Sequence, residues 1–353
     1  MSKYIEIYEK IKKDIIDGVF VQGEKLPSKR VCADRYGVSL ITCEHAYELL
    51  LEEGYAKSVE KKGYYVSFDR NFGEYFESYR VDVPVNRENS EERDYEEFSF
   101  SVYARKVRKV LLNYQEEVML KSPGFGVGQL RVAISEYLKK NRGIDCDFSQ
   151  IIVGAGAEYL YGMIVKVLGR NLIYGIEDPS YEKIQVIYEA EGIEINRLPL
   201  QNDGIVSEKL WSTNAGVLHI TPYRSYPSNI SASASKKHEY IKWMKEKEGY
   251  IIEDDFGSEF STLRKAEETI YELSGGSGVI YVNTFTKTIG SFVRIAYMVV
   301  PKDLIKDFER KLGMFNCTVP TLDQYVLSEL INDGDFARHI NRVRRVKRNE
   351  GNI

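Results

Sequence analysis

Residues 26–55 read LPSKRVCADRYGVSLITCEHAYELLLEEGY and contain the start and stop signals of two helices joined by a tight turn. Ser28 is a favourable N-cap for a helix over Lys29–Tyr36, and the glycine that follows adopts at low cost the left-handed conformation that ends a helix. Ser39 caps the next helix, which has apolar side chains at a spacing of three to four residues and ends at Gly54. This stretch therefore predicts a helix, a turn and a second helix.

The flanking segments complete the layout. Upstream, apolar side chains recur every three to four residues from Tyr4 to Ile16, which predicts an amphipathic helix. Downstream, Tyr55–Val59 and Gly63–Ser67 alternate as the strands of a short hairpin with a basic tip. Three helices and a two-stranded wing make a winged helix-turn-helix, whose third helix enters the major groove of DNA while the tip contacts phosphates. The candidate DNA contacts are Lys29, Arg30, Ser39, Thr42, Lys61, Lys62 and Gly63.

The distribution of charge separates the N-terminal segment from a linker. Residues 1–68 contain 11 basic and 11 acidic residues, a balance that argues weakly against DNA binding and leaves a small helical domain as the alternative. Residues 69–100 contain 4 basic and 10 acidic residues. We interpret residues 68–97 as an acidic linker between a domain at 1–67 and a second one at 98–353.

Bulk properties exclude several classes of protein. A chain of 353 residues suits two domains, and it has no apolar run long enough to cross a membrane. The N-terminus is charged and lacks the apolar core of a signal peptide. The four cysteines have no metal-binding spacing, so we expect reduced thiols, a cytoplasmic location and no metal site.

Beyond Glu97 the sequence alternates between short apolar strands and helical stretches. This alternation predicts an α/β fold with a mostly parallel sheet and helices on both faces. Ligands bind such sheets beyond the carboxyl ends of the strands. The expected strands are Ile151–Val153, Leu172–Tyr174, Gly216–Thr221, Tyr250–Glu253 and Val279–Asn283.

Four features follow these strands in an order that suits one cofactor. The small residues around Gly156 and Ala157 open a helix whose N-terminus can bind an anion. Asp254 ends a strand, where a carboxylate can keep a pyridine nitrogen protonated. Lys287 lies in a Thr-rich loop and can condense with an aldehyde, and Arg294 can bind a phosphate. Each residue alone is better explained as a surface or capping residue, whereas the ordered set indicates pyridoxal 5'-phosphate.

The N-terminal segment resembles the GntR class of bacterial DNA-binding domains. The matching residues are Leu26-Pro27-Ser28-Lys29-Arg30, Gly37-Val38-Ser39-Leu40-Ile41-Thr42, Ala46-Tyr47 and Glu53-Gly54-Tyr55. The resemblance implies that Arg30 and Thr42 touch DNA. Leu40 stands where an arginine is common, and the loss of that contact is expected to weaken binding or shift the preferred site.

From Glu97 to about Arg348 the chain resembles the aminotransferase-like domain of MocR/GabR-type regulators, which are fold type I pyridoxal phosphate proteins. Among the matching stretches are Glu177-Asp178-Pro179-Ser180-Tyr181, Glu253-Asp254-Asp255, Thr284-Phe285-Thr286-Lys287-Thr288 and Arg294-Ile295-Ala296-Tyr297. The resemblance implies that Lys287 is the catalytic lysine that holds the cofactor and Asp254 is the partner of its ring nitrogen. It also implies that Tyr181 stacks on the ring, and that Arg294 and the Gly156 loop bind the phosphate.

Departures from the family pattern predict weak or altered cofactor binding. Phe256 replaces a tyrosine that bonds the cofactor's ring oxygen, a loss of roughly 1 kcal/mol. Glu158 replaces a glutamine beside the phosphate loop and is expected to repel the anion, unless it turns away or Arg224, which replaces a histidine, offsets its charge. Family members continue for about another hundred residues, so we expect that the C-terminal small domain is missing.

Three functions remain open at this stage. The first is a transcription regulator that binds double-stranded promoter DNA and senses pyridoxal phosphate or its adduct with a small amine or amino acid. The resemblance implies a homodimer. The second is a pyridoxal phosphate-dependent aminotransferase, which the expected absence of the small domain disfavours. The third is a degenerate relative that has lost cofactor or DNA binding.

Overall fold

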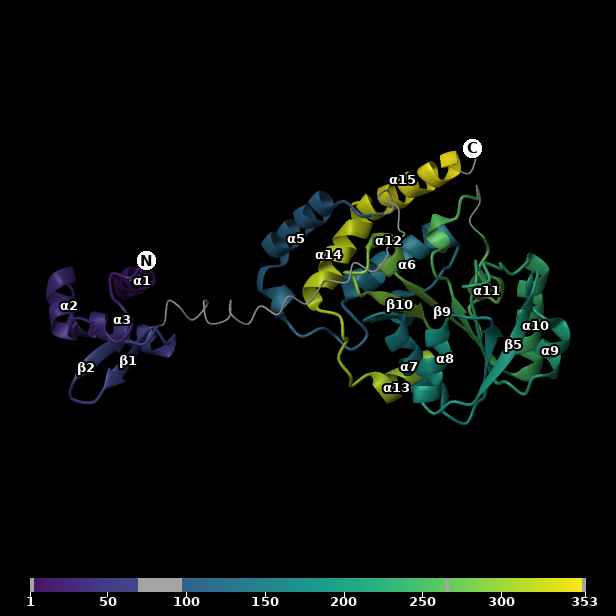
Figure 1. Ribbon diagram of the computed structural model, residues 1–353, viewed down its shortest axis with the longest axis horizontal. Coiled ribbons are helices and arrows are strands. Elements are labelled where there is room, and N and C mark those ends of the chain that lie inside the picture. The colour runs from purple at the N-terminus through teal and green to yellow at the C-terminus, as the bar shows by residue number, and fades with distance from the viewer. Residues whose placement is uncertain (1–2, 69–96, 264–266, 351–353) are drawn as a thin grey trace. The chain divides into compact units, whose positions relative to one another are not determined.

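The computed structural model describes residues 3–68, 97–263 and 267–350 (Figure 1). The chain divides into two compact units, residues 1–88 and 89–353. The predicted acidic linker lies outside the described residues except at its two ends. Along the described ranges, no helix combines the length and the apolar character that crossing a membrane requires.

The N-terminal unit is a three-helix domain with a two-stranded wing. The side chain of Ser28 accepts a hydrogen bond from the Val31 amide at 3.3 Å, and that of Ser39 accepts one from the Thr42 amide at 3.2 Å. Gly37 has a φ of 59°. The predicted winged helix-turn-helix is therefore confirmed, with both of its caps. Its elements are α1 (Lys3–Ile16), α2 (Lys29–Tyr36), α3 (Leu40–Glu52) and the antiparallel strands β1 (Ala56–Val59) and β2 (Gly63–Val66).

The third helix of this domain is buried along one side and exposed at its N-terminal end. Cys43, Ala46 and Leu50 are fully buried, and the Tyr47 hydroxyl donates a 2.6 Å hydrogen bond to the Pro27 carbonyl. That bond joins α3 to the loop that precedes α2. Leu40, the first residue of α3, stays exposed to solvent. Core packing thus fixes the position of α3, while the N-terminal end of the helix, which would face DNA, remains accessible to solvent.

An eight-stranded mixed sheet forms the centre of the larger unit (Figure 1), in the order β3-β10-β9-β8-β7-β4-β5-β6. Strands β9, β8, β7, β4 and β5 are parallel to their neighbours in that run, whereas β10 is antiparallel to β3 and β9, and β6 to β5. The predicted α/β class is confirmed. The strands are β3 (Ile151–Gly154), β4 (Tyr174–Asp178), β5 (Ile195–Gln201), β6 (Gly204–Ile205), β7 (Val217–Ile220), β8 (Tyr250–Asp254), β9 (Val279–Thr284) and β10 (Ala296–Val299).

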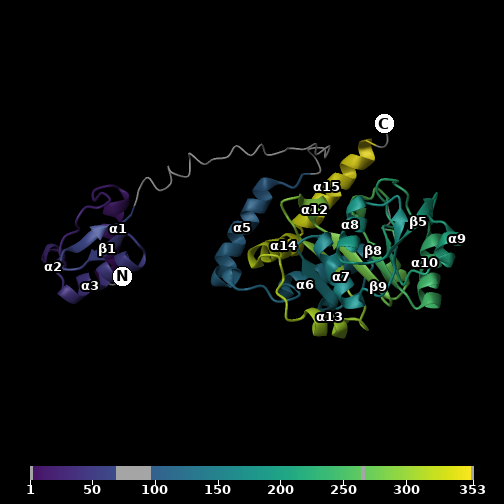
Figure 2. The same cartoon turned by 60° about the horizontal axis from the view of Figure 1, so that its bottom comes forward.

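Helices cover both faces of the sheet, and the strands β3, β7, β9 and β10 are buried along their whole length. One face packs against α6, α10, α11, α14 and α15, and the other against α7, α8 and α13; α7 and α13 lie side by side (Figures 1 and 2). The helices are α5 (Phe100–Tyr114), α6 (Gly128–Arg142), α7 (Ala157–Leu168), α8 (Glu182–Ala190), α9 (Ser207–Ser212), α10 (Ala234–Lys247), α11 (Ile270–Leu273), α12 (Thr286–Ile289), α13 (Ile305–Leu312), α14 (Thr321–Asn332) and α15 (Asp335–Glu350), with 3₁₀ turns η2 (Gln115–Met119), η3 (Phe148–Gln150) and η4 (Ser258–Phe260).

The structure corrects the predicted strands in two places. The strand expected at Leu172–Tyr174 is β4, which begins only at Tyr174, and β5, β6 and β10 were not predicted. Glycine and acidic residues are poor strand formers, so Gly175 and Glu177 conceal β4 in the sequence. In the fold, Glu177 is buried and its carboxylate accepts hydrogen bonds from the Ser225 hydroxyl at 2.6 Å and the Thr221 amide at 3.2 Å.

The buried Glu177 carboxyl makes stability depend on pH. Burial raises its pKa from 4.5 to about 7. The folded chain therefore holds this proton more tightly than the unfolded chain, and the resulting stability, present below pH 4.5, is lost as pH rises through 7. Between pH 5 and 8 this group is expected to lower the free energy of unfolding by roughly 2 kcal/mol. We therefore expect the melting temperature of the larger unit to fall less over this range in Glu177→Gln than in the wild type. The exposed Glu182→Gln is the control, and an unchanged pH slope in Glu177→Gln would contradict this account.

Candidate functional site

The candidate cofactor residues meet at one edge of the sheet. The parallel strands β8 and β9 end there, at Asp254 and just before Lys287. Because β10 runs antiparallel, its first residue, Ala296, pairs with the last residues of β3 and β9, Gly154 and Thr284. Arg294, two residues before β10, therefore lies at the same edge as the Gly156 loop.

Asp254 is the acid at the base of this site. Its residue is 9% exposed, and its Oδ2 atom accepts a 2.5 Å hydrogen bond from the Tyr161 hydroxyl on α7. His219 Nε2, on β7, lies 3.8 Å from the same oxygen and has no hydrogen bond among the described residues. The other ring nitrogen of His219 is 2.7 Å from the Tyr188 hydroxyl. The sequence did not reveal Tyr161, His219 or Tyr188 as members of this group, because they lie on α7, β7 and α8 and belong to no common motif.

The two acids that flank Asp254 have structural roles. Glu253 accepts 2.8 Å hydrogen bonds from the amides of Ile270 and Tyr271, and burial raises its pKa to about 7. Asp255 forms a 2.7 Å ion pair with the buried Arg142 and accepts a 2.6 Å bond from Tyr281. Of the acidic triplet at the end of β8, Asp254 is thus the one joined to the Tyr161 and His219 pair.

The Gly156 loop and Arg294 form the candidate anion-binding end of the site. Gly156 has a φ of 95°, and a Cβ atom there would lie only 3.2 Å from Arg294 Nη2. Glycine therefore allows the guanidinium to lie against the loop. Ala157 begins the 12-residue helix α7, whose N-terminus favours an anion. Arg294 itself is 58% exposed and thus accessible to a ligand.

Glu158 shares this end of the site with two cations. Its carboxylate lies 3.1 Å from Lys183 Nζ and 3.8 Å from Arg294 Nη2. Its charge is therefore balanced by Lys183 and Arg294, while Arg224, which sequence reasoning considered for that role, lies over the Tyr223 ring. A phosphate at the Gly156 loop would compete with Glu158 for Arg294.

Lys287 lies on the one-turn helix α12 and not in the loop that the sequence predicts. Its side chain is half-buried, and a Cβ atom at Gly257 would lie 3.8 Å from its Cγ. The turn is braced by a 3.0 Å hydrogen bond between the hydroxyls of Thr284 and Thr286. Since β8 and β9 are adjacent, Lys287 and Asp254 follow neighbouring strands at the same edge.

Two aromatic residues follow parallel strands that end at this edge, Tyr181 after β4 and Phe256 after β8. Tyr181 is the N-cap residue of α8 and is 42% exposed, with its ring centroid 6.2 Å from that of Tyr226. Phe256, which follows the acidic triplet, is 47% exposed and offers no hydroxyl group. An accessible ring at Tyr181 suits stacking on a flat ligand, and that role stays a prediction.

The charged residues of the candidate DNA interface fall into two groups. Arg30, Lys61 and Lys62 are exposed, and the last two are at the tip of the wing beside Gly63. Lys29 instead forms an ion pair with Glu44 of the same domain. Because that pairing occupies its ammonium group, Lys29 is the candidate least available for a phosphate contact.

The N-terminal turn of α3 presents a mixed surface. The hydroxyls of Ser39 and Thr42 lie 2.8 Å apart, so the cap also positions Thr42. Leu40 and Ile41 are 46% and 63% exposed. Exposed apolar side chains at this end of a recognition helix can contact thymine methyl groups. Sequence reasoning did not single out Ile41.

Comparison with known proteins relates each unit to a family. Residues 3–66 match the bacterial regulatory proteins of the gntR family, and residues 94–350 match aminotransferase class I and II. The Bacillus subtilis HTH-type transcriptional regulator YdeL is 30% identical, over 98% of this chain and 76% of its own length. The Corynebacterium glutamicum HTH-type pyridoxine biosynthesis transcriptional regulator PdxR is 24% identical, over 99% and 77%.

Solved aminotransferases share the fold of the larger unit. LysN, an α-aminoadipate aminotransferase of Thermus thermophilus, aligns with a TM-score of 0.63 and 23% identity, over 70% of this chain and 64% of that one. The Pyrococcus horikoshii kynurenine aminotransferase gives a TM-score of 0.64 and 21% identity, with the same coverage. The chain thus spans a little under two thirds of these structures. It belongs to the MocR/GabR-type family of regulators, which join a gntR-type helix-turn-helix domain to an aminotransferase class I and II domain.

Proposed function

We propose that this chain is a cytoplasmic, homodimeric transcription regulator that binds double-stranded promoter DNA through residues 1–67. In this proposal the unit at residues 98–353 binds pyridoxal 5'-phosphate and senses either the cofactor or its adduct with a small amine or amino acid. Effector binding shifts the population of two arrangements that differ in their affinity for DNA.

The convergence of Asp254, Lys287 and Arg294 on one sheet edge is the observation that carries the cofactor proposal. The residues present fit the group: a buried carboxylate, an accessible guanidinium and a loop in which a Cβ atom at Gly156 would crowd that guanidinium. Bound pyridoxal phosphate supplies an aldehyde that condenses with amines and a ring that acts as an electron sink.

Each residue has a separate task in this proposal. Asp254 accepts a hydrogen bond from the ring nitrogen, and Tyr161 holds the carboxylate in place through its 2.5 Å bond. Lys287 provides the amine for the aldehyde. Arg294 and the N-terminus of α7 bind the phosphate.

A pyridoxal phosphate-dependent aminotransferase is the second candidate, because the same three residues would serve it. The exposed Phe256, which lacks a hydroxyl group for the cofactor, counts against efficient catalysis. Transfer of an amino group to a 2-oxo acid by the wild-type chain, abolished in Lys287→Ala, would favour this candidate over a sensor without turnover.

Cofactor binding is tested by titrating the purified chain with pyridoxal phosphate. We expect a visible absorbance band that becomes fixed to the protein by borohydride in the wild type and in Lys306→Ala, an exposed lysine on α13. Lys287→Ala should give neither signal, because the amine that binds the aldehyde is gone. Equal labelling of Lys287→Ala would refute the assignment, and no band in the wild type would refute cofactor binding.

The affinity of that site should be limited by Glu158. Glu158→Gln releases Arg294 and removes a negative charge beside the phosphate loop. Because the pair is partly exposed, we expect a modest gain of about fivefold in affinity, roughly 1 kcal/mol. Equilibrium titrations would measure this gain, with Glu182→Gln on the next helix as the control. Weaker binding by Glu158→Gln would show that Glu158 supports the site.

DNA binding is tested on a duplex selected in vitro by the wild-type protein. We expect Arg30→Ala to weaken binding and to reduce the slope of log affinity against log salt by about 1, as the loss of one phosphate contact would. Leu40→Arg should increase both affinity and slope, the latter by about 0.9. Lys13→Ala, on α1, is the matched control. Equal effects of Lys13→Ala and Arg30→Ala would place the interface elsewhere.

A further inference from the structure

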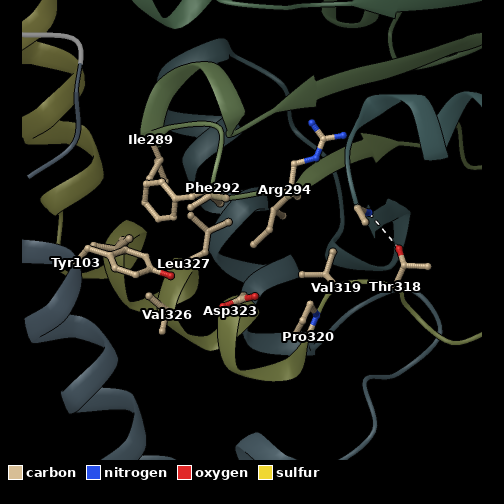
Figure 3. Close-up of a pocket in the computed structure, with 14 residues that line it drawn as sticks. Tyr103, Ile289, Phe292, Arg294, Thr318, Val319, Pro320, Asp323, Val326 and Leu327 are labelled. Atoms are coloured by element: carbon tan, nitrogen blue, oxygen red, sulfur yellow. Dashed lines mark hydrogen bonds between the residues drawn. The ribbon is translucent and has the colours of Figure 1, made fainter. Parts of the chain in front are cut away.

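A cavity of about 290 Å³ adjoins the candidate cofactor site and shares Arg294 with it, whereas Lys287 and Asp254 do not line it. Its walls come from α5, the segment between α12 and β10, and the first turns of α14 (Figure 3). Ligand pockets for drug-sized molecules enclose about 300 to 1,000 Å³. The volume therefore suits a small molecule.

The lining is mostly apolar, with Asp323 as its acid. Ile289, Phe292, Val326 and Leu327 supply hydrocarbon and aromatic surface, and the half-buried Asp323 lies among them (Figure 3). A lining of this composition favours an apolar ligand body, and the carboxylate adds a point of recognition.

The Asp323 side chain has no ion-pair partner among the described residues. It forms no ion pair or hydrogen bond with any residue in the ranges that the structure describes, and burial raises its pKa. Arg294, the other charged residue of the lining, directs its guanidinium away from Asp323 in Figure 3 and pairs with Glu158. A carboxylate in apolar surroundings is costly unless a cation accompanies it.

The neighbouring Tyr103 adds a second polar group. Its ring packs edge-on against Phe292 with the centroids 5.0 Å apart, and burial together with the charge of Asp323 raises the pKa of its hydroxyl. The Tyr103 hydroxyl stays neutral and can accept a hydrogen bond from a donor that also faces Asp323.

We propose that this cavity binds a small apolar monoamine, with the ammonium group on Asp323 and the hydrocarbon or aromatic part against Phe292, Val326 and Leu327. Binding is noncovalent and does not use Lys287. The ligand class differs from a free amino acid, because the guanidinium of Arg294, the cation of the lining, points away from Asp323 and does not face the same space (Figure 3).

The cavity shares a wall with the phosphate loop. The Ala155 amide donates a 3.1 Å hydrogen bond to the Thr318 hydroxyl, and both residues line the cavity. Arg294 contacts the cavity as well as the Gly156 loop. An amine in the cavity would thereby change the affinity of the phosphate loop for its anion, and the anion would change the affinity for the amine by the same factor. Only this coupling rests on the proposed cofactor site.

A structural role for Asp323 predicts a different result. An acid in the first turn of a helix stabilises it through the helix dipole, and Asp323 occupies that position in α14. If Asp323 had this role alone, Asp323→Asn would lower the stability of the chain, and the wild-type chain would bind no amine in the cavity. The experiment therefore compares ligand binding directly.

The test uses full-length Lys287→Ala chain without cofactor, in a buffer free of amines, so that no covalent adduct contributes. Benzylamine hydrochloride and its neutral isostere benzyl alcohol are titrated by calorimetry. We expect saturable binding of benzylamine, at least tenfold weaker binding of benzyl alcohol, and at least a tenfold loss of benzylamine affinity in Asp323→Asn. Asp307→Asn, which changes a partly exposed acid on α13 that pairs with Arg310, should leave the affinity unchanged.

A second variant guards against misfolding of Asp323→Asn. Phe292 is 60% exposed, so Phe292→Ala removes one cavity wall with little effect on the core and should weaken benzylamine binding severalfold. No benzylamine binding, equal binding of the alcohol, or undiminished binding in a folded Asp323→Asn chain would overturn the proposal. Because this variant lacks Lys287 and is tested without cofactor, a failure to bind benzylamine would say nothing against the proposed cofactor site. Adding inorganic phosphate to the same titration measures the coupling.

Discussion

The antiparallel insertion of β10 between β3 and β9 is the constraint on which the candidate site depends. Its register places Ala296 beside both Gly154 and Thr284, and so brings Arg294 to the edge where the parallel strands end. Without that strand, the phosphate loop and the lysine helix would belong to separate parts of the sheet. The same segment also forms a wall of the cavity that contains Asp323. One strand pairing therefore positions residues of both candidate sites.

The polar groups beneath the site show how the fold tolerates several buried acids. Glu253 is held by backbone amides, Asp255 by Arg142, and Asp254 by Tyr161. Because alternate residues of a strand point to opposite faces, the central acid of the triplet has partners different from those of its neighbours. Burying a carboxylate without such partners raises the free energy of the folded chain, so each acid of the triplet depends on the groups that contact it.

At the anion-binding end, the chain balances charge by means of its own residues. Glu158 is paired with Lys183 and Arg294, so the repulsion expected from sequence is softened while the arginine is partly occupied. A site arranged in this way responds to ligand concentration over a higher range than one with a free arginine.

The sequence alone determined the winged helix-turn-helix with its caps, the α/β class and which residue types follow the strands, because these depend on periodicity and on local capping chemistry. It missed β10 and most of β4, since their pairing partners lie far away in the chain and Glu177 is stabilised by contacts with Ser225 and Thr221. Tyr161 and His219 became visible only in the tertiary structure, as did the unpaired Asp323 in its cavity. Contacts between distant segments have no local signature, and burial decides the electrostatics of an acid only once the chain has folded.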